Sequence, residues 1–369
     1  AVPRDDARVR VIDAAAGEET TFDLEPELAP QRGDWSNYPM TVARRLARNF
    51  PDARRGVDLA FCSDLPPAAG MSSSSAFIIA VFLALREVNH LAEHPEYRRN
   101  IPDDLSLAEY LGTNENGQSY RELPGDRGVG TFGGSEDHTG ILCSEPGALG
   151  QFAYCPTRLE RRVAVPEGYT FAIGSSGVVA EKTGAALERY NRVSARAAAL
   201  VDAWTGSTGR EAPTLAAIVE QGEAAIDELG AIVRRQPPAG FEGGELQRRL
   251  DQFCLEHLQI VGQAGAALDR GDLGEFSRLV VRSQRAGADL LENQVEETVA
   301  LAAMACDSCA EAASAFGAGF GGSVWALVTA AEAPAFLEQW ERDYRARFPQ
   351  RGEALFLTTG AGSSAFELA

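Results

Sequence analysis

The stretch PPAAGMSSSSAF at residues 66–77 places four consecutive serines between a Pro/Gly loop and an apolar run. The residues before it, GVDLAFCSDL (56–65), alternate between apolar and polar side chains as a β-strand does. The residues after it, AFIIAVFLALREV (76–88), lack Gly and Pro over about three helical turns. The pattern therefore predicts a strand, a tight loop and a serine-rich helix start, whose backbone N–H groups can face an anion.

The number of serines favours a phosphate-binding loop over a simple helix cap. An ordinary helix start needs one capping residue, whereas four follow the loop here. Gly70 lets the backbone approach a phosphate closely. Serine hydroxyls donate to phosphate oxygens or bind Mg²⁺, which prefers hard oxygen ligands. The candidate side chains are those of Ser72, Ser73, Ser74 and Ser75. The loop is not of the Walker type, because the sequence has no G-x-x-x-x-G-K-[ST].

Length and composition limit the class of protein. The chain has 369 residues, with 45% hydrophobic and 24% charged residues, as in an ordinary globular protein of two domains. A net charge of −19 argues against nonspecific nucleic-acid binding, and no apolar stretch approaches the roughly 20 residues that span a bilayer. Six cysteines in apolar settings favour a reduced, cytoplasmic protein. CDSC at 306–309 has CxxC spacing but no second pair, which disfavours a redox or metal site.

The pattern of apolar residues and breakers predicts an α+β protein, since both halves mix strands and helices without regular βαβ alternation. Strands are expected over 7–13, 18–24, 57–63, 141–143, 151–154, 170–175, 324–328 and 353–359. Helices are expected over 35–50, 72–89, 105–120, 183–204, 213–235, 246–269, 273–287, 294–313 and 331–348. We place the domain boundary so that the domains span 1–165 and 166–369.

A second candidate site lies in GGSEDHTG (133–140), where two glycines permit a tight turn before Asp137. The carboxylate there could accept a proton from a hydroxyl nucleophile or orient that hydroxyl. An aspartate that only caps a turn or a helix is the alternative, and the residues alone leave both open. For His138 we favour a packed turn residue over a ligand.

Three further features carry weaker signals. The glycine cluster GAGFGGS (317–323) runs into a predicted strand rather than a helix, which is the wrong context for a dinucleotide fingerprint. A loop without side chains can pack against a ligand or another backbone. Glu115 stands near a predicted helix C-terminus, where a negative charge is unfavourable, so it suggests a partner of which a metal is one candidate. Lys182 is the only lysine, and both a surface position and a functional role remain open.

Together these segments resemble the GHMP small-molecule kinases, which are named for galactokinase, homoserine kinase, mevalonate kinase and phosphomevalonate kinase. PPAAGMSSSSAF is similar to the family loop P-x-x-x-G-[LM]-S-S-S-[AS], and GAGFGGSVWALV is similar to the glycine motif G-G-G-F-G-G. GDWSNY (33–38) and ALERYNR (186–192) resemble the galactokinase branch. The resemblance implies a ribosomal-protein-S5-like N-terminal domain and a ferredoxin-like C-terminal domain, with nucleotide and substrate in the cleft between them.

The resemblance also implies roles for individual residues. Gly70 and the four serines would hold the phosphates of ATP, Ser74 with Glu115 would hold Mg²⁺, and Asp137 would be the catalytic residue. The implied substrate-binding residues are Asp137, Tyr190, Lys182, Gly319, Gly321 and Gly322.

The chain departs from the galactokinase pattern in three places. It lacks the N-terminal signature G-R-V-N-L-I-G-E-H-T-D-Y, so we expect either an upstream piece of several tens of residues or a real truncation. GGSEDHTG stands where galactokinases have G-I-M-D-Q, and SSGVVAEKTG (175–184) stands in place of N-S-x-V-R-H. These differences fall on the substrate side, so the resemblance does not identify galactose as the acceptor.

The implied activity is transfer of the γ-phosphoryl group of ATP to a hydroxyl, expected to be the anomeric one, of a sugar, sugar phosphate or sugar derivative. The alternatives are a non-catalytic sensor of ATP and sugar on the same fold, and a kinase of a non-sugar alcohol. We expect a monomer or homodimer that binds neither nucleic acid nor membrane.

Overall fold

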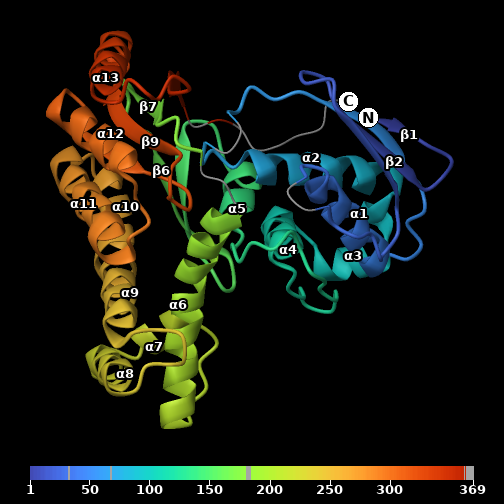
Figure 1. Cartoon of the computed structure of the whole chain (residues 1–369), viewed down its shortest axis with the longest axis horizontal. Helices are drawn as coiled ribbons and strands as arrows, with labels where there is room; N and C mark the ends of the chain where they lie inside the picture. Colours follow the sequence, from blue (N-terminus) through green and yellow to red (C-terminus); the bar gives the residue numbers. More distant parts are fainter. Residues whose placement is uncertain (32–33, 67–68, 180–183, 361, 363–369) are drawn as a thin grey trace. The chain divides into compact units, whose positions relative to one another are not determined.

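The computed structural model describes the chain apart from residues 32–33, 67–68, 180–183, 361 and 363–369. The chain forms two compact units, which are described separately (Figure 1). Among the described residues, the first unit contains Ala1–Glu145, Pro156–Arg158 and Gly362, and the second contains Pro146–Cys155 and Leu159–Gly360. The sequence predicts a domain boundary at 165. In the structure the second unit already includes the strand at 148–153 and nearly all of the strand at 158–164.

The first unit contains a four-stranded sheet in the order β1-β4-β2-β3. Its strands are β1 (Val2–Pro3), β2 (Arg8–Asp13), β3 (Glu19–Asp23) and β4 (Val57–Phe61). β2 and β3 form an antiparallel hairpin, whereas β2 and β4 are parallel. β2 alternates as the sequence predicts, because Val9 and Val11 are fully buried while Arg8 is exposed.

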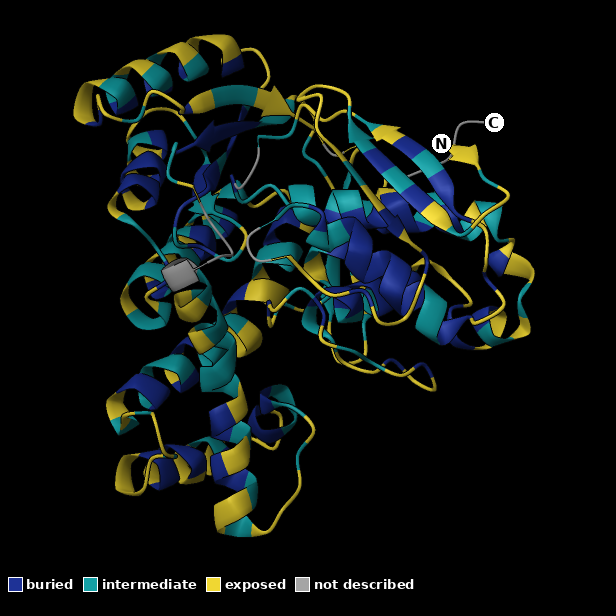
Figure 2. Cartoon of the chain, turned by 45° about the vertical axis from the view of Figure 1, so that its right-hand side comes forward, coloured by how far each residue is buried: buried dark blue, intermediate teal, exposed yellow. Residues whose placement is uncertain are grey.

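Helices of the first unit pack on this sheet around one apolar core (Figure 2). They are α1 (Asn37–Asn49), α2 (Ser73–Val88), η1 (Leu91–Glu93), α3 (Pro95–Asn100), α4 (Asp104–Asn116) and α5 (Glu136–Leu142). In α2 the fully buried residues Ile78, Phe82 and Leu85 recur at helical spacing and face the core. Burial of this stripe fixes α2, and with it the serine-rich start of the helix.

The second unit contains a hairpin and a four-stranded antiparallel sheet in the order β10-β7-β9-β8. The strands are β5 (Ala148–Ala153), β6 (Arg158–Ala164), β7 (Tyr169–Ser175), β8 (Ala312–Ala315), β9 (Ser323–Thr329) and β10 (Leu355–Thr359). Trp340 is fully buried against the sheet and donates its indole N–H to the Leu301 carbonyl at 3.0 Å. Gly174 makes room for this ring, since a β-carbon there would lie 2.8 Å from it.

Helices make up the rest of the second unit. They are α6 (Gly184–Thr208), α7 (Leu215–Val219), α8 (Glu223–Arg235), α9 (Gly243–Leu255), α10 (Val261–Asp269), α11 (Leu273–Ala286), α12 (Glu296–Asp307) and α13 (Ala333–Arg347). Two π-helical segments, η2 (Glu256–Ile260) and η3 (Gly287–Leu291), follow α9 and α11. None of the helices in the described part of the chain is long and apolar enough to cross a membrane.

The α+β class is confirmed, but several predicted elements are wrong. The strand expected at 141–143 is the end of α5, because so short an apolar run does not distinguish a strand from a buried helical turn. The helix expected over 213–235 is two helices, α7 and α8. The break between them includes Gly222, which has a φ of 103°, a backbone conformation that glycine adopts more readily than other residues. The helix expected over 294–313 ends at Asp307, and β8 follows. α4 ends at Asn116, where Gly117 adopts the left-handed conformation of a C-terminal cap.

Candidate functional site

The start of α2 has an unusual backbone. Ser72, the N-cap residue, has a φ of 54° and lies in the left-handed region of the backbone map. This conformation is energetically unfavourable for serine but not for glycine. In the described part of the chain no side chain caps this helix. The first intrahelical bond runs from the Ala76 N–H to the Ser72 carbonyl at 3.0 Å, so the N–H groups before it have no intrahelical acceptor. A strained, uncapped helix start is suited to an anionic ligand.

The four serines divide into two groups by burial. Ser72, Ser73 and Ser74 are partly exposed, whereas Ser75 is fully buried. The Ser75 hydroxyl lies 3.5 Å from Oδ2 of Asp137, at the outer limit of a hydrogen bond. The structure therefore brings together two predicted site segments, 66–77 and 133–140, which are far apart in the sequence.

Asp137 lies in the first turn of the short helix α5 and is half-buried. A carboxylate there also complements the positive end of the helix, so its position has a structural reason as well. The residue before α5 packs closely against α4. A β-carbon on Gly112 of α4 would lie only 2.9 Å from Cα of Ser135, the N-cap residue of α5. His138 is fully buried, as expected for a packed residue rather than an exposed ligand.

Glu115 occupies the last turn of α4 and is 3% exposed. Arg45 donates to the Gln118 carbonyl at 2.7 Å, just beyond this helix end. The positive guanidinium offsets the unfavourable interaction of Glu115 with the negative end of the helix dipole. The position of Glu115 at a helix C-terminus therefore does not by itself indicate a metal ion. Among the described residues, no group of three or more His, Cys, Asp or Glu side chains could hold a metal ion. That finding is compatible with Mg²⁺, which proteins often bind through one or two carboxylates together with substrate phosphates.

In the second unit the glycine loop is fixed by its own protein contacts. Residues 319–322 all have positive φ, including Phe320 at 61°. A β-carbon on Gly319 would lie 2.1 Å from the Asn293 carbonyl oxygen, and one on Gly321 would lie 2.7 Å from that of Val178. Gly322 donates to Val178 at 3.0 Å. These contacts explain the glycines without a ligand. The role of Asn293, which also donates to the Ala318 carbonyl, had no signal in the sequence.

The remaining predicted substrate residues are less well defined. Tyr190 is half-buried on α6, one residue after Arg189, whose guanidinium lies 5.6 Å from the centre of the Phe320 ring. This contact links α6 to the glycine loop. Lys182 lies outside the described residues.

Known proteins share this architecture. The family model for the GHMP kinase N-terminal domain matches residues 37–114, and that for the GHMP kinase C-terminal domain matches 266–346. The chain is 27% identical to the galactokinases of Chloroflexus aurantiacus and Chloroflexus aggregans, over 98% of this chain and 83% of each relative. The crystal structure of Lactococcus lactis galactokinase complexed with galactose has the same fold. Its TM-score is 0.78 at 21% identity, over 99% of this chain and 85% of that one.

The two-unit α+β fold and the two matched domains define a small-molecule kinase, a phosphotransferase with an alcohol group as acceptor. The chain thus carries the N- and C-terminal domains of the GHMP kinases, and over 98% of its residues it is galactokinase-like. The predicted family and two-domain fold are therefore confirmed, and the family implies the use of ATP.

Proposed function

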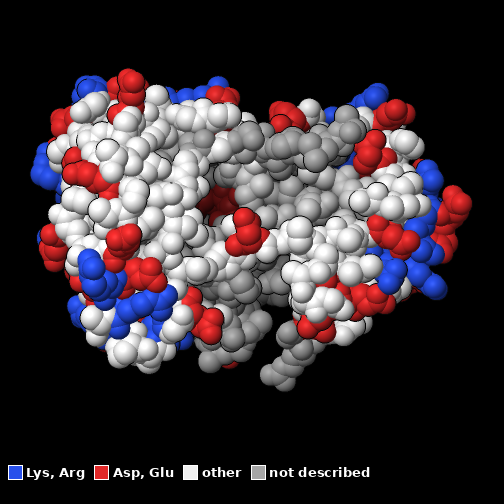
Figure 3. Space-filling view, turned by 90° about the horizontal axis from the view of Figure 1, so that it is seen from above, with Lys and Arg blue, Asp and Glu red and all other residues white. Residues whose placement is uncertain are grey.

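We propose that the protein transfers the γ-phosphoryl group of ATP to a hydroxyl of a sugar or sugar derivative, with the anomeric C1 hydroxyl as acceptor. The full-length similarity to two galactokinases supports a sugar as the substrate. The six cysteines, all free thiols, fit a cytoplasmic enzyme. Charged side chains of both signs are interspersed on the surface in Figure 3, which suits a small-molecule substrate better than a nucleic acid.

The observation that carries the proposal is the 3.5 Å contact between Ser75 and Asp137, which brings a carboxylate to an uncapped helix start. Phosphoryl transfer needs positioning and charge neutralisation more than covalent chemistry. The α2 N-terminus, with Gly70 and the hydroxyls of Ser72, Ser73 and Ser74, would bind the phosphates. The buried Ser75 would contribute its backbone N–H and orient Asp137.

Asp137 would orient the attacking hydroxyl of the sugar and accept its proton as the bond to phosphorus forms. The 3.5 Å contact with Ser75 supports this role, because it brings Asp137 to the helix start that we propose to bind the phosphates. The other residues that we propose to bind the sugar are Tyr190, Gly319, Gly321 and Gly322. We also propose that Lys182 binds the substrate, on the basis of its position in the sequence.

Ser74 and Glu115 are the residues that we propose to hold Mg²⁺. A serine hydroxyl and a carboxylate are hard oxygen donors, and together with phosphate oxygens they fit this ion. When bound, Mg²⁺ neutralises charge on the transferred phosphoryl group. Ser74 lies in the first turn of α2 and Glu115 in the last turn of α4, and both helices belong to the first unit, which supports this assignment.

A coupled assay of ADP release tests the proposal. Hexoses, pentoses, heptoses and their phosphates are each mixed with the enzyme, ATP and Mg²⁺, and isoprenoid alcohols serve as the non-sugar set. We expect release with at least one free sugar, and a phosphorus–H1 coupling in the product by NMR. Release with an isoprenoid alcohol alone would contradict the sugar assignment. Nucleotide binding without turnover of any acceptor would instead indicate a sensor.

A further inference from the structure

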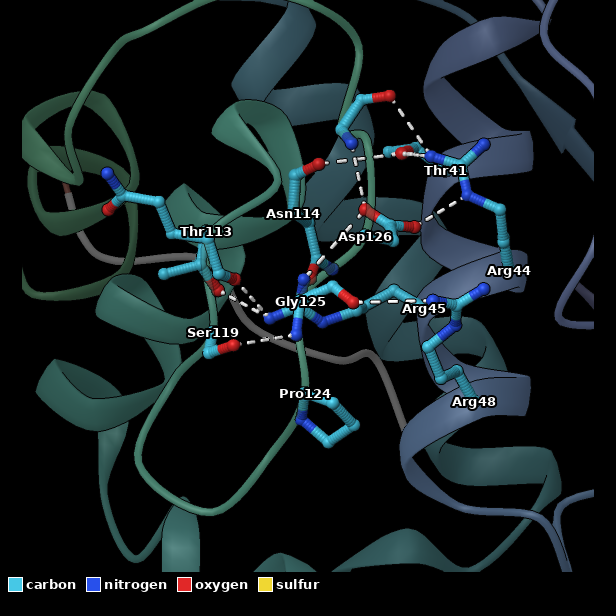
Figure 4. Close-up of polar contacts among 12 residues, drawn as sticks. Thr41, Arg44, Arg45, Arg48, Thr113, Asn114, Ser119, Pro124, Gly125 and Asp126 are labelled. Carbon is cyan, nitrogen blue, oxygen red and sulfur yellow. Dashed lines mark hydrogen bonds and ion pairs between the residues drawn. The ribbon is translucent and has the colours of Figure 1, made fainter.

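A buried ion pair joins α1 to the segment that follows α4 (Figure 4). Nε of Arg44 lies 2.5 Å from Oδ2 of Asp126, which is 82 residues away in the sequence, and the side chains are 1% and 2% exposed. Arg45 places a second guanidinium 3.9 Å from the other carboxylate oxygen. Two buried arginines thus face one carboxylate.

The pair holds a turn of the segment in place. Oδ1 of Asp126 accepts from the Gly128 N–H at 2.8 Å, and Arg44 donates to the Gly128 carbonyl at 3.0 Å. The Asp126 N–H donates to the Gly117 carbonyl at 2.9 Å. Both polar groups of the Gly128 backbone are therefore bonded to the ion pair itself.

This turn closes onto the last turn of α4, which carries Glu115. The Val129 N–H donates to the Glu115 carbonyl at 2.9 Å, and the Thr41 hydroxyl donates to the Asn114 carbonyl at 3.4 Å. A β-carbon on Gly128 would lie 2.2 Å from the Glu115 carbonyl oxygen, so the turn fits only without a side chain. Carbonyls at a helix end have no intrahelical donor, and here α1 and the turn supply donors.

We propose that the Arg44–Asp126 pair is a positioning element for Glu115, and that it sets the affinity of the site for Mg²⁺. This inference rests on the proposed role of Glu115. A metal ligand binds well when the groups behind it fix its orientation. Burying ionic groups is a poor route to stability alone, because their desolvation is costly. The location of this pair, at the one helix end that carries the candidate ligand, indicates a positioning role.

The test measures binding of the non-hydrolysable ATP analogue AMP-PNP by calorimetry, with and without Mg²⁺, on the full chain. The ratio of the two affinities reports metal binding without turnover. The variants are Glu115→Gln, Asp126→Asn, their combination, and Thr41→Val. Thr41→Val removes a hydroxyl that accepts from Arg44 at 2.8 Å. The control is Glu96→Gln, which removes the partner of Arg99 in an exposed ion pair on α3.

We expect Asp126→Asn and Glu115→Gln each to lower the ratio about tenfold, with Mg²⁺-free binding changed less than about twofold. The double variant should lower it no further than Glu115→Gln does, because both changes act through one ligand. Thr41→Val should lower it less, and Glu96→Gln should not change it. If Asp126→Asn does not fold, Thr41→Val carries the test.

Two results would overturn the inference, and they differ. If Glu115→Gln lowers the ratio while folded Asp126→Asn and Thr41→Val keep the wild-type value, the positioning role is wrong and the magnesium site stands. If Glu115→Gln itself keeps the wild-type ratio, the proposed magnesium ligand is wrong, and the positioning role is lost with it.

Discussion

The carbonyl oxygen of Asn293 occupies the space that a β-carbon on Gly319 would need, at 2.1 Å. The Asn293 carbonyl also accepts from the Phe320 N–H at 2.5 Å, and the Asn293 side chain donates to the Ala318 carbonyl at 3.2 Å. The segment that follows the π-helix η3 thus holds the glycine loop in a left-handed path. The loop is built by packing within its own unit, before any ligand is considered.

Gly319→Ala should therefore destabilise the protein by about 2 kcal/mol or more, since it adds a steric clash to a φ of 83°. The measurement is thermal unfolding, where we expect a loss of roughly 4–8 °C. Gly206→Ala is the matched control, because Gly206 lies within α6 and a β-carbon there meets nothing within 4 Å. That change should leave stability equal or raise it. Equal melting temperatures for the two variants would refute the packing argument.

Asp137→Asn should reduce kcat by on the order of 10² if the carboxylate accepts the proton of the sugar hydroxyl. Stability should fall by no more than about 1 kcal/mol, because the contact with Ser75 is long at 3.5 Å and the carboxylate mainly complements the N-terminus of α5. Turnover is measured by ADP release with the best sugar. Glu93→Gln is the control, since it removes an exposed carboxylate on η1 that has no role in the proposed site, and it should keep activity. Near-full turnover of Asp137→Asn would remove Asp137 from the catalytic role.

Ser72→Gly separates strain from ligand binding at the helix start. Glycine adopts the left-handed φ of 54° without the cost to serine of about 1 kcal/mol or more, so the melting temperature should not fall. Loss of a hydroxyl that bonds a charged phosphate should raise KM for ATP about tenfold. Ser72→Ala is the control, because it removes the hydroxyl but keeps the strain. If both variants keep the wild-type KM, the Ser72 hydroxyl does not contact the nucleotide.

The sequence predicted those parts of the fold whose signal is local. α2 and its serine-rich start were predicted because the apolar stripe and the loop lie within one short stretch. β8 was missed because its sequence, AASA, has no β-branched or aromatic residue, and it is a strand through pairing with β9. The local sequence pattern determines the helix α2, whereas pairing with a neighbouring strand determines the strand β8.

The candidate site shows the same division. Gly70, the serines and Asp137 stand in recognisable motifs, so their residues could be named from the sequence. The partnership of Arg44 with Asp126 could not be predicted, because it joins residues 82 positions apart. Neither residue lies in a motif, and buried pairs of this kind depend on how α1 and the segment after α4 pack. Residues that support a site through long-range packing are thus less predictable from the sequence than residues that stand in its motifs.

The CxxC pair offers the last test. Desolvation raises the pKa of the Cys306 and Cys309 thiols, whereas redox-active CxxC cysteines have a lowered pKa. Burial also raises the pKa of Cys143 and of Cys254 to about 11, so at pH 8 only about one thiol in a thousand is ionised at each.

We therefore expect iodoacetamide at pH 8 to modify the exposed Cys62 and Cys155 first. Cys143 and Cys254 should react slowly, and their rates should rise as the pH approaches 11, since deprotonation exposes the reactive thiolate. Mass spectrometry of peptides over time gives each rate, and unfolded protein in guanidinium is the control in which the differences should vanish. Fast, pH-independent labelling of Cys306 would contradict the raised pKa and restore a redox role for that pair.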